Sequence, residues 1–230
     1  MSIFDPIPGE TPIDDISELK VKGITTRGEL AIYEAENIRK ALIKYLAAKP
    51  SHKLAPFDFA WSLQLHKEMF DEVWAHAGQL RKKNLNIGVP WEHVEVQLFS
   101  LLKDLPVWGQ GGMALLEQAA QLHHRAVSIH PFKDGNGRWS RLLANIWLKQ
   151  NDAPDVQWPA QVGVKSPIRD EYLDAIRKAD DGDLGPLTEL HRRFTAVLLP
   201  RRRIARPLDV PPPLRSAPPR KRRRPLPPNG

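Results

Sequence analysis

The residues most capable of chemistry lie in one stretch, HPFKDGNGRWSR, which runs from His130 to Arg141. It follows an apolar helical segment and precedes another, and Gly135 and Gly137 stand at the junction. Backbone N–H groups at a helix start have no intrahelical partner, and glycine leaves room for an anion to approach them. The pattern therefore predicts a phosphate-binding turn.

Two arginines follow the glycines on one helix face. Arg138 and Arg141 are three residues apart and lie near the helix start, where the helix dipole disfavours positive side chains. An anion held between them would remove that disadvantage. The pair therefore indicates a polyphosphate ligand.

Three more residues complete the segment. Asp134 is a hard oxygen ligand suited to a Mg²⁺ ion that bridges phosphate oxygens. His130 has an intrinsic pKa near neutrality and suits removal of a hydroxyl proton, while Phe132 is expected to anchor the loop in the core. The alternative interpretation is that the glycines merely join two helices and the arginines form surface ion pairs.

This segment resembles the signature of the Fic family, His-Pro-Phe-x-Asp/Glu-Gly-Asn-Gly-Arg-x-x-Arg, and all nine specified positions match. The flanking runs LHHRAVSIHPF and EYLDAIRKADDGDLGPLTELHRRF are similar to the helices around the Fic loop. The run EAENIRKA is similar to the bacterial Fic subgroup called mobile mystery protein B. Together the resemblance covers about residues 10–200.

The resemblance implies an all-α Fic fold that transfers AMP from ATP to a side-chain hydroxyl of a target protein, with self-modification among the outcomes. It implies a role for each motif residue: general base His130, Mg²⁺ ligand Asp134, anion hole Gly135, Asn136 and Gly137, and β- and γ-phosphate ligands Arg138 and Arg141. Catalysis would then consist mainly of positioning and charge stabilisation.

Residues 81–90 (RKKNLNIGVP) break the helical period and occupy the place of the Fic flap, which docks the target segment by strand-like pairing. The expected contact positions are Asn86, Ile87 and Gly88. A plain connecting loop or a short hairpin is the alternative.

Glu36 and Asn37 resemble the end of the family's inhibitory motif, Ser/Thr-x-x-x-Glu-Gly/Asn, whose glutamate pairs with the second motif arginine. Ile32 stands where that motif has Ser or Thr, so this chain departs from the pattern. An exposed helix charge is the alternative interpretation of Glu36.

Two other functions are compatible with these residues. A Fic-like core could transfer another nucleotidyl or phosphoryl group, although the intact GNGR run favours nucleotidyl over phosphate transfer. Alternatively, the core could be vestigial in a regulator that binds nucleic acid through a basic tail. A vestigial core is expected to have lost its motif histidine or arginines, and this one retains them.

Helical periodicity dominates the chain that must position the motif, so the predicted fold class is all-α. Thr26 and Glu29 form a capping box for the first helix, and Ser166 with Pro167 start a later one. The adjacent His123 and His124 point about 100° apart on one helix, which favours structural or solvent-facing roles over metal binding. The predicted helices cover residues 29–49, 57–78, 91–105, 112–128, 135–149, 167–178 and 187–199.

Composition adds a domain division. The chain has 230 residues and a formal charge of +7, but residues 200–230 hold ten Lys or Arg and one Asp, giving +9, so the rest carries −2. That tail also holds ten of the 22 prolines. We expect an N-terminal extension at 1–25, a Fic-like helical domain at 26–199, and a disordered tail at 200–230 with weak polyanion binding.

No cysteine is present, which excludes a thiolate zinc site and a thiol nucleophile. The first residues lack the basic start and apolar run of a secretion signal, and no stretch has the roughly 18 apolar residues of a membrane span. These features predict a soluble cytoplasmic protein without a membrane partner.

Deleting residues 201–230 is expected to abolish salt-sensitive retention of the chain on an immobilised polyanion, because the positive charge is concentrated there. Elution position against salt concentration measures the effect. Unchanged retention after the deletion would place the charge-driven contact elsewhere.

Overall fold

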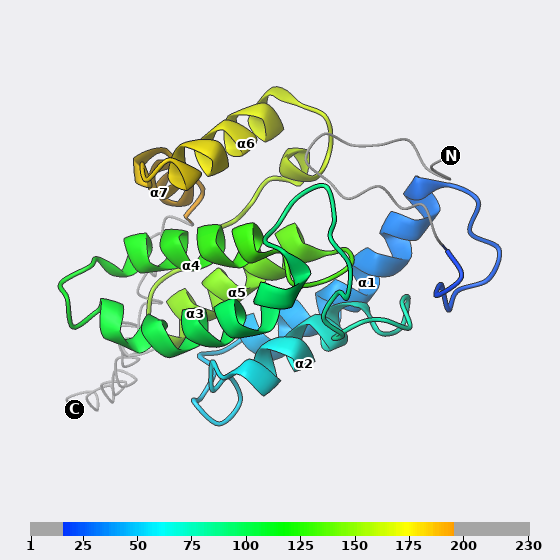
Figure 1. The fold of residues 1–230 in the computed structure, drawn as a ribbon, viewed down its shortest axis with the longest axis horizontal. Helices are drawn as coiled ribbons and strands as arrows, with labels where there is room; N and C mark the ends of the chain where they lie inside the picture. The colour runs from blue at the N-terminus through cyan, green and yellow to red at the C-terminus, as the bar shows by residue number, and fades with distance from the viewer. Residues whose placement is uncertain (1–15, 196–230) are drawn as a thin grey trace, which may run out of the picture. The chain divides into compact units, whose positions relative to one another are not determined.

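The structure is a computed structural model that describes residues 16–195. Within these residues the chain is helical and forms no strand, which confirms the predicted all-α class (Figure 1). None of the described helices combines the length and apolar character needed to cross a membrane. The predictions for the tail at 200–230 and for the first 15 residues lie outside the described residues.

The α-helices and two short 3₁₀-helices follow one another in this order: α1 Arg27–Leu46, α2 Phe59–Phe70, η1 Trp91–His93, α3 Val94–Trp108, α4 Leu115–Ile129, α5 Asn136–Gln150, η2 Ala160–Gly163, α6 Pro167–Asp180 and α7 Gly185–Phe194.

Helices α4 and α5 form the centre of the fold, and the motif is the turn between them (Figure 1). Helices α1, α2 and α3 pack on one side of this pair around the larger apolar core, which includes the buried Phe70, Phe132 and Trp139. Helices α6 and α7 pack on α4 around a second apolar cluster, which includes Tyr172 and Leu187. The motif turn is therefore held from both sides.

Both predicted helix starts are confirmed. The Thr26 hydroxyl accepts the Glu29 N–H at 3.2 Å, and the Glu29 carboxylate accepts the Thr26 N–H at 3.1 Å, which completes the capping box of α1. The Ser166 hydroxyl likewise accepts the Arg169 N–H at the start of α6. Local side-chain chemistry determines these two boundaries.

The predicted end of the second helix was wrong, because α2 ends at Phe70 and not at Gly78. Beyond Phe70 the backbone pairs with the segment that precedes α1: the Lys20 N–H donates to the Val73 carbonyl at 2.8 Å, and the Ala75 N–H donates to the Glu18 carbonyl at 2.9 Å. The apolar period continues past the helix end, but these long-range hydrogen bonds replace the intrahelical ones.

Candidate functional site

The motif turn has a left-handed residue at each end. His130 ends α4 with φ 53° and ψ 60°, and Gly135 precedes α5 with φ 72° and ψ −2°. A Cβ atom on Gly135 would lie 2.7 Å from the ring of Phe70, so both the backbone conformation and the space require glycine there. The first intrahelical hydrogen bonds come from Arg138 and Trp139, which leaves the N–H groups of the preceding residues directed out of the helix start.

Phe132 anchors the turn, as its sequence position predicts. Its side chain is fully buried, with its ring centroid 3.6 Å from that of His66 and 5.0 Å from that of Trp139. Asn136 closes the loop around it, because its side chain accepts the Phe132 N–H and donates to the Phe132 carbonyl, both at 2.9 Å. The Asn136 side chain is therefore used inside the loop, and its backbone N–H is the group it can offer to an anion.

His66 holds the turn from α2, a contact that the sequence did not indicate. Its Nδ1 accepts the Gly78 N–H at 3.0 Å, so Nε2 carries the proton and donates to the Asp134 carbonyl at 3.1 Å. Burial lowers the pKa of His66 to about 3, so the ring stays neutral and keeps this tautomer.

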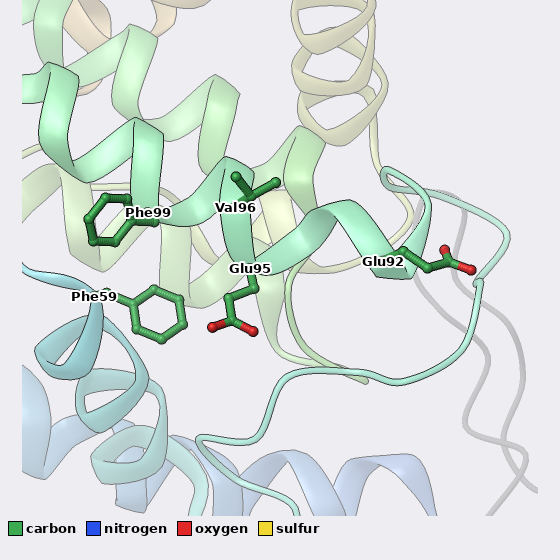
Figure 2. Close-up of a pocket in the computed structure, with 5 residues that line it drawn as sticks. All are labelled: Phe59, Glu92, Glu95, Val96 and Phe99. Carbon is green, nitrogen blue, oxygen red and sulfur yellow. The ribbon is translucent and has the colours of Figure 1, made fainter.

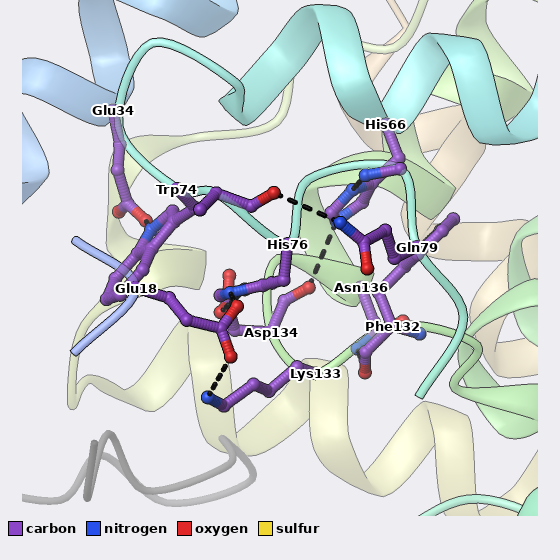
Figure 3. A network of polar contacts seen from close by, with 12 residues as sticks. Glu18, Glu34, His66, Trp74, His76, Gln79, Phe132, Lys133, Asp134 and Asn136 are labelled. Carbon is purple, nitrogen blue, oxygen red and sulfur yellow. Dashed lines mark hydrogen bonds and ion pairs between the residues drawn. The ribbon is translucent and has the colours of Figure 1, made fainter. Parts of the chain in front are cut away.

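The Asp134 carboxylate belongs to a polar chain that reaches the segment before α1 (Figure 3). Its Oδ2 lies 2.7 Å from His76 Nε2, and His76 Nδ1 lies 2.8 Å from a carboxylate oxygen of Glu18. Lys133 contacts the other Glu18 oxygen at 3.3 Å. Burial acts to lower the pKa of His76, but Asp134 and then Glu18 outweigh it and raise that pKa. Asp134 Oδ1 is buried and has no hydrogen-bond partner among the described residues.

His130 is buried beneath the loop at 81–90, so the predicted flap covers the predicted general base. A Cβ atom on Gly88 would lie 2.6 Å from His130 Cβ, and the Arg81 Nε donates to the His130 carbonyl at 2.7 Å. Burial, with a smaller effect of the Arg81 charge, lowers the pKa of His130 to about 4. The imidazole is therefore neutral near pH 7.

The flap itself is an irregular loop. Leu80 forms an isolated antiparallel bridge with Phe132, and the Arg81 N–H donates to the Pro131 carbonyl at 3.0 Å. Arg81 was not identified from the sequence, because an arginine beside two lysines reads as a surface charge, yet it is buried and also donates to the Lys83 and Val89 carbonyls. The predicted docking positions Asn86 and Gly88 are exposed, and Ile87 is half-buried.

Arg138 is paired with an acid from α1. Its two guanidinium nitrogens lie 2.6 and 3.2 Å from the two carboxylate oxygens of Glu34, which also accepts the Trp74 indole N–H at 2.9 Å. Glu34 is only 5% exposed. Burial acts to raise its pKa, but the charge and hydrogen bonds of Arg138 outweigh it and the pKa of Glu34 is lowered.

The predicted contact between Glu36 and a motif arginine is not formed in the described structure. Glu36 lies on the exposed face of α1 and pairs with Arg39, with both N–O distances 2.8 Å. Two residues along an α-helix turn the side chain by about 200°, so Glu34 and Glu36 point in opposite directions. The acid that reaches the motif is Glu34, and the arginine it reaches is Arg138, the first of the two.

Arg141 differs from Arg138 because no carboxylate pairs with it within the described residues. Its neighbour is Tyr172 of α6, whose ring centroid lies 5.9 Å from the Arg141 guanidinium carbon. Burial lowers the pKa of Arg141, which nevertheless stays charged at neutral pH. A charged guanidinium in this environment is suited to binding an anion.

A separate pocket of about 370 Å³ lies between the start of α2 and the outer face of α3 (Figure 2). Phe59, Val96 and Phe99 line it together with Glu92 and Glu95. None of these residues belongs to the motif, so this pocket is distinct from the motif turn.

The arrangement of these helices is similar to the Fic fold, and residues 56–148 match the model of the Fic/DOC family. The match ends within α5, so it includes the motif, the flap and α2, but not α6 or α7.

Comparisons with individual proteins show the same similarity. A protein adenylyltransferase fic-1 from Caenorhabditis briggsae is 31% identical over 146 residues, which are 61% of this chain and 27% of that protein. Fic-1 from C. elegans has a similar structure, with a TM-score of 0.61 at 25% identity over 76% of this chain and 50% of that one. The chain spans about a quarter of the length of the curated relatives it matches, 24% to 29% of each.

The fold also matches a bacterial structure across nearly its full length. BepC from Bartonella tribocorum, solved with bound AMPPNP, has a TM-score of 0.58 at 20% identity, covering 78% of this chain and 93% of that one. At 20% identity, this similarity supports a shared fold only.

Replacing Glu34 by Gln is expected to tighten ATP binding about tenfold, because the variant keeps the side-chain shape but releases the charge of Arg138. Titration calorimetry with ATP measures the change. The matched control is Glu36→Gln, two residues away on the exposed face, which is expected to bind ATP like the unchanged chain. An increase in affinity for Glu36→Gln alone would contradict the assignment of Glu34.

Proposed function

We propose that this protein transfers AMP from ATP to a side-chain hydroxyl of a protein. The observation that carries the proposal is Arg141, a partly buried charge without a carboxylate, beside the outward N–H groups of Asn136 and Gly137. These groups form a site for a polyphosphate, and a neutral His130 lies on the same turn. The relatives named protein adenylyltransferases support AMP as the transferred group.

In this proposal the start of α5 binds the α- and β-phosphates through the backbone N–H groups of Gly135, Asn136 and Gly137. Arg141 and Arg138 hold the β- and γ-phosphates. Their positive charge stabilises the pyrophosphate as it leaves, and no covalent intermediate with the protein is needed.

His130 accepts the proton of the target hydroxyl while the hydroxyl oxygen attacks the α-phosphorus. The bond between the α-phosphorus and the bridging oxygen breaks, and pyrophosphate takes the electron pair. The left-handed conformation of His130 and the Arg81 hydrogen bond to its carbonyl fix the direction of the imidazole.

Asp134 fits the role of a Mg²⁺ ligand, because its Oδ1 is buried without a partner while His76 holds its Oδ2. Among the described residues, no three His, Asp or Glu side chains converge on a point that could hold a metal ion by themselves. Nucleotide phosphates would therefore supply further ligands. A bound Mg²⁺ ion would neutralise phosphate charge.

The target is a protein segment that lies along the flap, with contacts at Asn86, Ile87 and Gly88. The exposure of Asn86 and Gly88 and the position of Gly88 against His130 support this, since a segment docked there lies next to the base. Self-modification uses the same geometry with a hydroxyl of a second copy. Cytoplasmic location stays a prediction, as does the division into residues 1–25, 26–199 and 200–230.

Autoinhibition by helix α1 is part of the proposal, with Glu34 in place of the predicted Glu36. The buried pairing of Glu34 with Arg138 supports it, because a guanidinium held by a carboxylate has fewer donors left for a phosphate.

Incubation of the full-length Glu34→Gln variant with ATP, Mg²⁺ and a cell lysate is expected to add one AMP unit to a protein, or to the variant itself. Intact-mass and peptide mass spectrometry with isotopically labelled ATP identify the group and its site. His130→Ala in the same background is expected to retain ATP binding and lose transfer by at least about 100-fold. Addition of a bare phosphate or of another nucleotide would show that the protein transfers that group and not AMP. No addition to any protein would contradict a transferase function.

As the pH is lowered, the transfer rate is expected to fall to half its maximum only near pH 4, well below the ordinary histidine pKa of 6.5. The reason is that the folded protein holds the pKa of His130 low, so the base stays unprotonated as the pH falls through 6.5. Initial rates between pH 4.5 and 8 at saturating ATP test this, with circular dichroism confirming that the protein stays folded. A half-maximal rate near pH 6.5 would contradict a buried, low-pKa base.

A further inference from the structure

A chain of side-chain contacts connects the segment before α1 to the carboxylate of Asp134 (Figure 3). One carboxylate oxygen of Glu18 lies 2.8 Å from His76 Nδ1, and His76 Nε2 lies 2.7 Å from Asp134 Oδ2. The other Glu18 oxygen lies 3.3 Å from Lys133 Nζ. Glu18 therefore reaches the motif in two places, once through an imidazole and once directly.

Backbone pairing fixes the position of Glu18. Leu19 forms an isolated antiparallel bridge with Trp74, and two backbone hydrogen bonds flank it, one of 2.8 Å from the Lys20 N–H and one of 2.9 Å to the Glu18 carbonyl. The paired stretch of backbone leads directly into His76. The same hydrogen bonds that place Glu18 therefore also place the ring that it contacts.

The His76 ring is closely confined. Its side chain is only 8% exposed, and its ring centroid lies 5.2 Å from that of Trp74. An ionised carboxylate can only accept hydrogen bonds, so each ring nitrogen donates to the acid it faces. The imidazole cannot flip or turn away from Asp134 without losing its contact with Glu18 as well.

This contact determines which oxygen of Asp134 is left for another ligand. Oδ2 accepts from His76, whereas Oδ1 is buried and has no hydrogen-bond partner among the described residues. A buried carboxylate oxygen without a partner is costly, and a cation would satisfy it. Rotation of the carboxylate would turn Oδ1 away from its present direction, and the hydrogen bond from His76 opposes that rotation.

We propose that Glu18, acting through His76, is a positioning residue for Asp134 and holds its carboxylate in the orientation that presents Oδ1 to the Mg²⁺ ion of the bound nucleotide. The inference rests on the proposed function for the identity of the cation. It makes the segment before α1 part of the metal site, although the Fic/DOC family match begins only at residue 56.

The test measures ATP binding to the full-length chain by titration calorimetry, once with Mg²⁺ and once with EDTA. All proteins carry His130→Ala, so that ATP is bound but not consumed. Glu18→Ala is expected to weaken ATP binding about threefold with Mg²⁺ and to leave binding in EDTA unchanged, because Asp134 acts on the nucleotide through the metal. No loss with Mg²⁺, or an equal loss in EDTA, would overturn the positioning role.

The conservative variant Glu18→Gln tests the hydrogen bond itself. Its amide oxygen can still accept from His76 Nδ1, so most of the affinity for ATP with Mg²⁺ is expected to return. The matched control is Glu171→Ala, another partly exposed glutamate in an ion pair, with N–O distances of 2.8 and 2.6 Å to Arg193. This control is expected to bind ATP normally in both conditions. An affinity of Glu18→Gln as low as that of Glu18→Ala would contradict a role through this hydrogen bond.

A further pair of variants separates the route through His76 from the one through Lys133. His76→Phe keeps a ring beside Trp74 but cannot donate to Asp134, and it is expected to weaken ATP binding with Mg²⁺ about tenfold. Adding Glu18→Ala to His76→Phe is expected to cause no further loss, because Glu18 acts through that ring. A further threefold loss would assign the effect of Glu18 to Lys133 and overturn the inference. If His76→Phe does not fold by circular dichroism, the Glu18 variants still decide.

Failure of the inference is distinguishable from failure of the proposed function. If Mg²⁺ strengthens ATP binding equally in the chain with Glu18 and in Glu18→Ala, only the role of Glu18 is wrong. If Mg²⁺ has no effect on either, the metal role of Asp134 is wrong and the inference with it. If the Mg²⁺-specific loss is observed but the chain with an intact His130 transfers no AMP, the positioning role stands and the proposed reaction is wrong.

Discussion

The buried contact between Phe132 and His66 is the interaction on which the motif geometry depends. The backbone turns back on both sides of the buried Phe132, through the left-handed residues His130 and Gly135. Those two turns direct the start of α5 and its N–H groups toward the side where His130 lies. His66 adds a hydrogen bond to the Asp134 carbonyl, so one buried ring both stacks on the anchor and holds the loop. Moving either ring would shift all of these groups together.

The two motif arginines show how the protein treats positive charge near a helix start. Arg138 is paired with Glu34, an acid on α1, whereas Arg141 lies against the ring of Tyr172. In the proposed function, the first arrangement stabilises the nucleotide-free protein and competes with a phosphate for Arg138. The second leaves a charge that the proposed nucleotide would stabilise. Arg138 is therefore held by a carboxylate, whereas Arg141 has no carboxylate partner among the described residues. The acid that holds Arg138 comes from α1.

Much of this architecture could be predicted from local sequence. The capping box at Thr26 and the Ser166 cap are interactions between residues three apart, so the sequence contains both partners. The early end of α2 could not be predicted, because the hydrogen bonds that replace its last turns come from residues 18 and 20. The choice of Glu34 over Glu36 was missed for a similar reason. Both acids lie on α1, and only the packing of α1 against α2 and α5 decides which of them faces Arg138.

The sequence by itself determined the chemical groups of the site and their order: base, carboxylate, glycine turn and two in-phase arginines, all within one continuous segment. Tertiary structure alone decided what each group contacts. Arg81, His76 and Glu34 are separated from the motif by many residues, and their contacts with it form only when the helices pack. The physical reason is that hydrogen-bond direction, burial and pKa depend on neighbours in space, which the periodicity of a single helix does not specify.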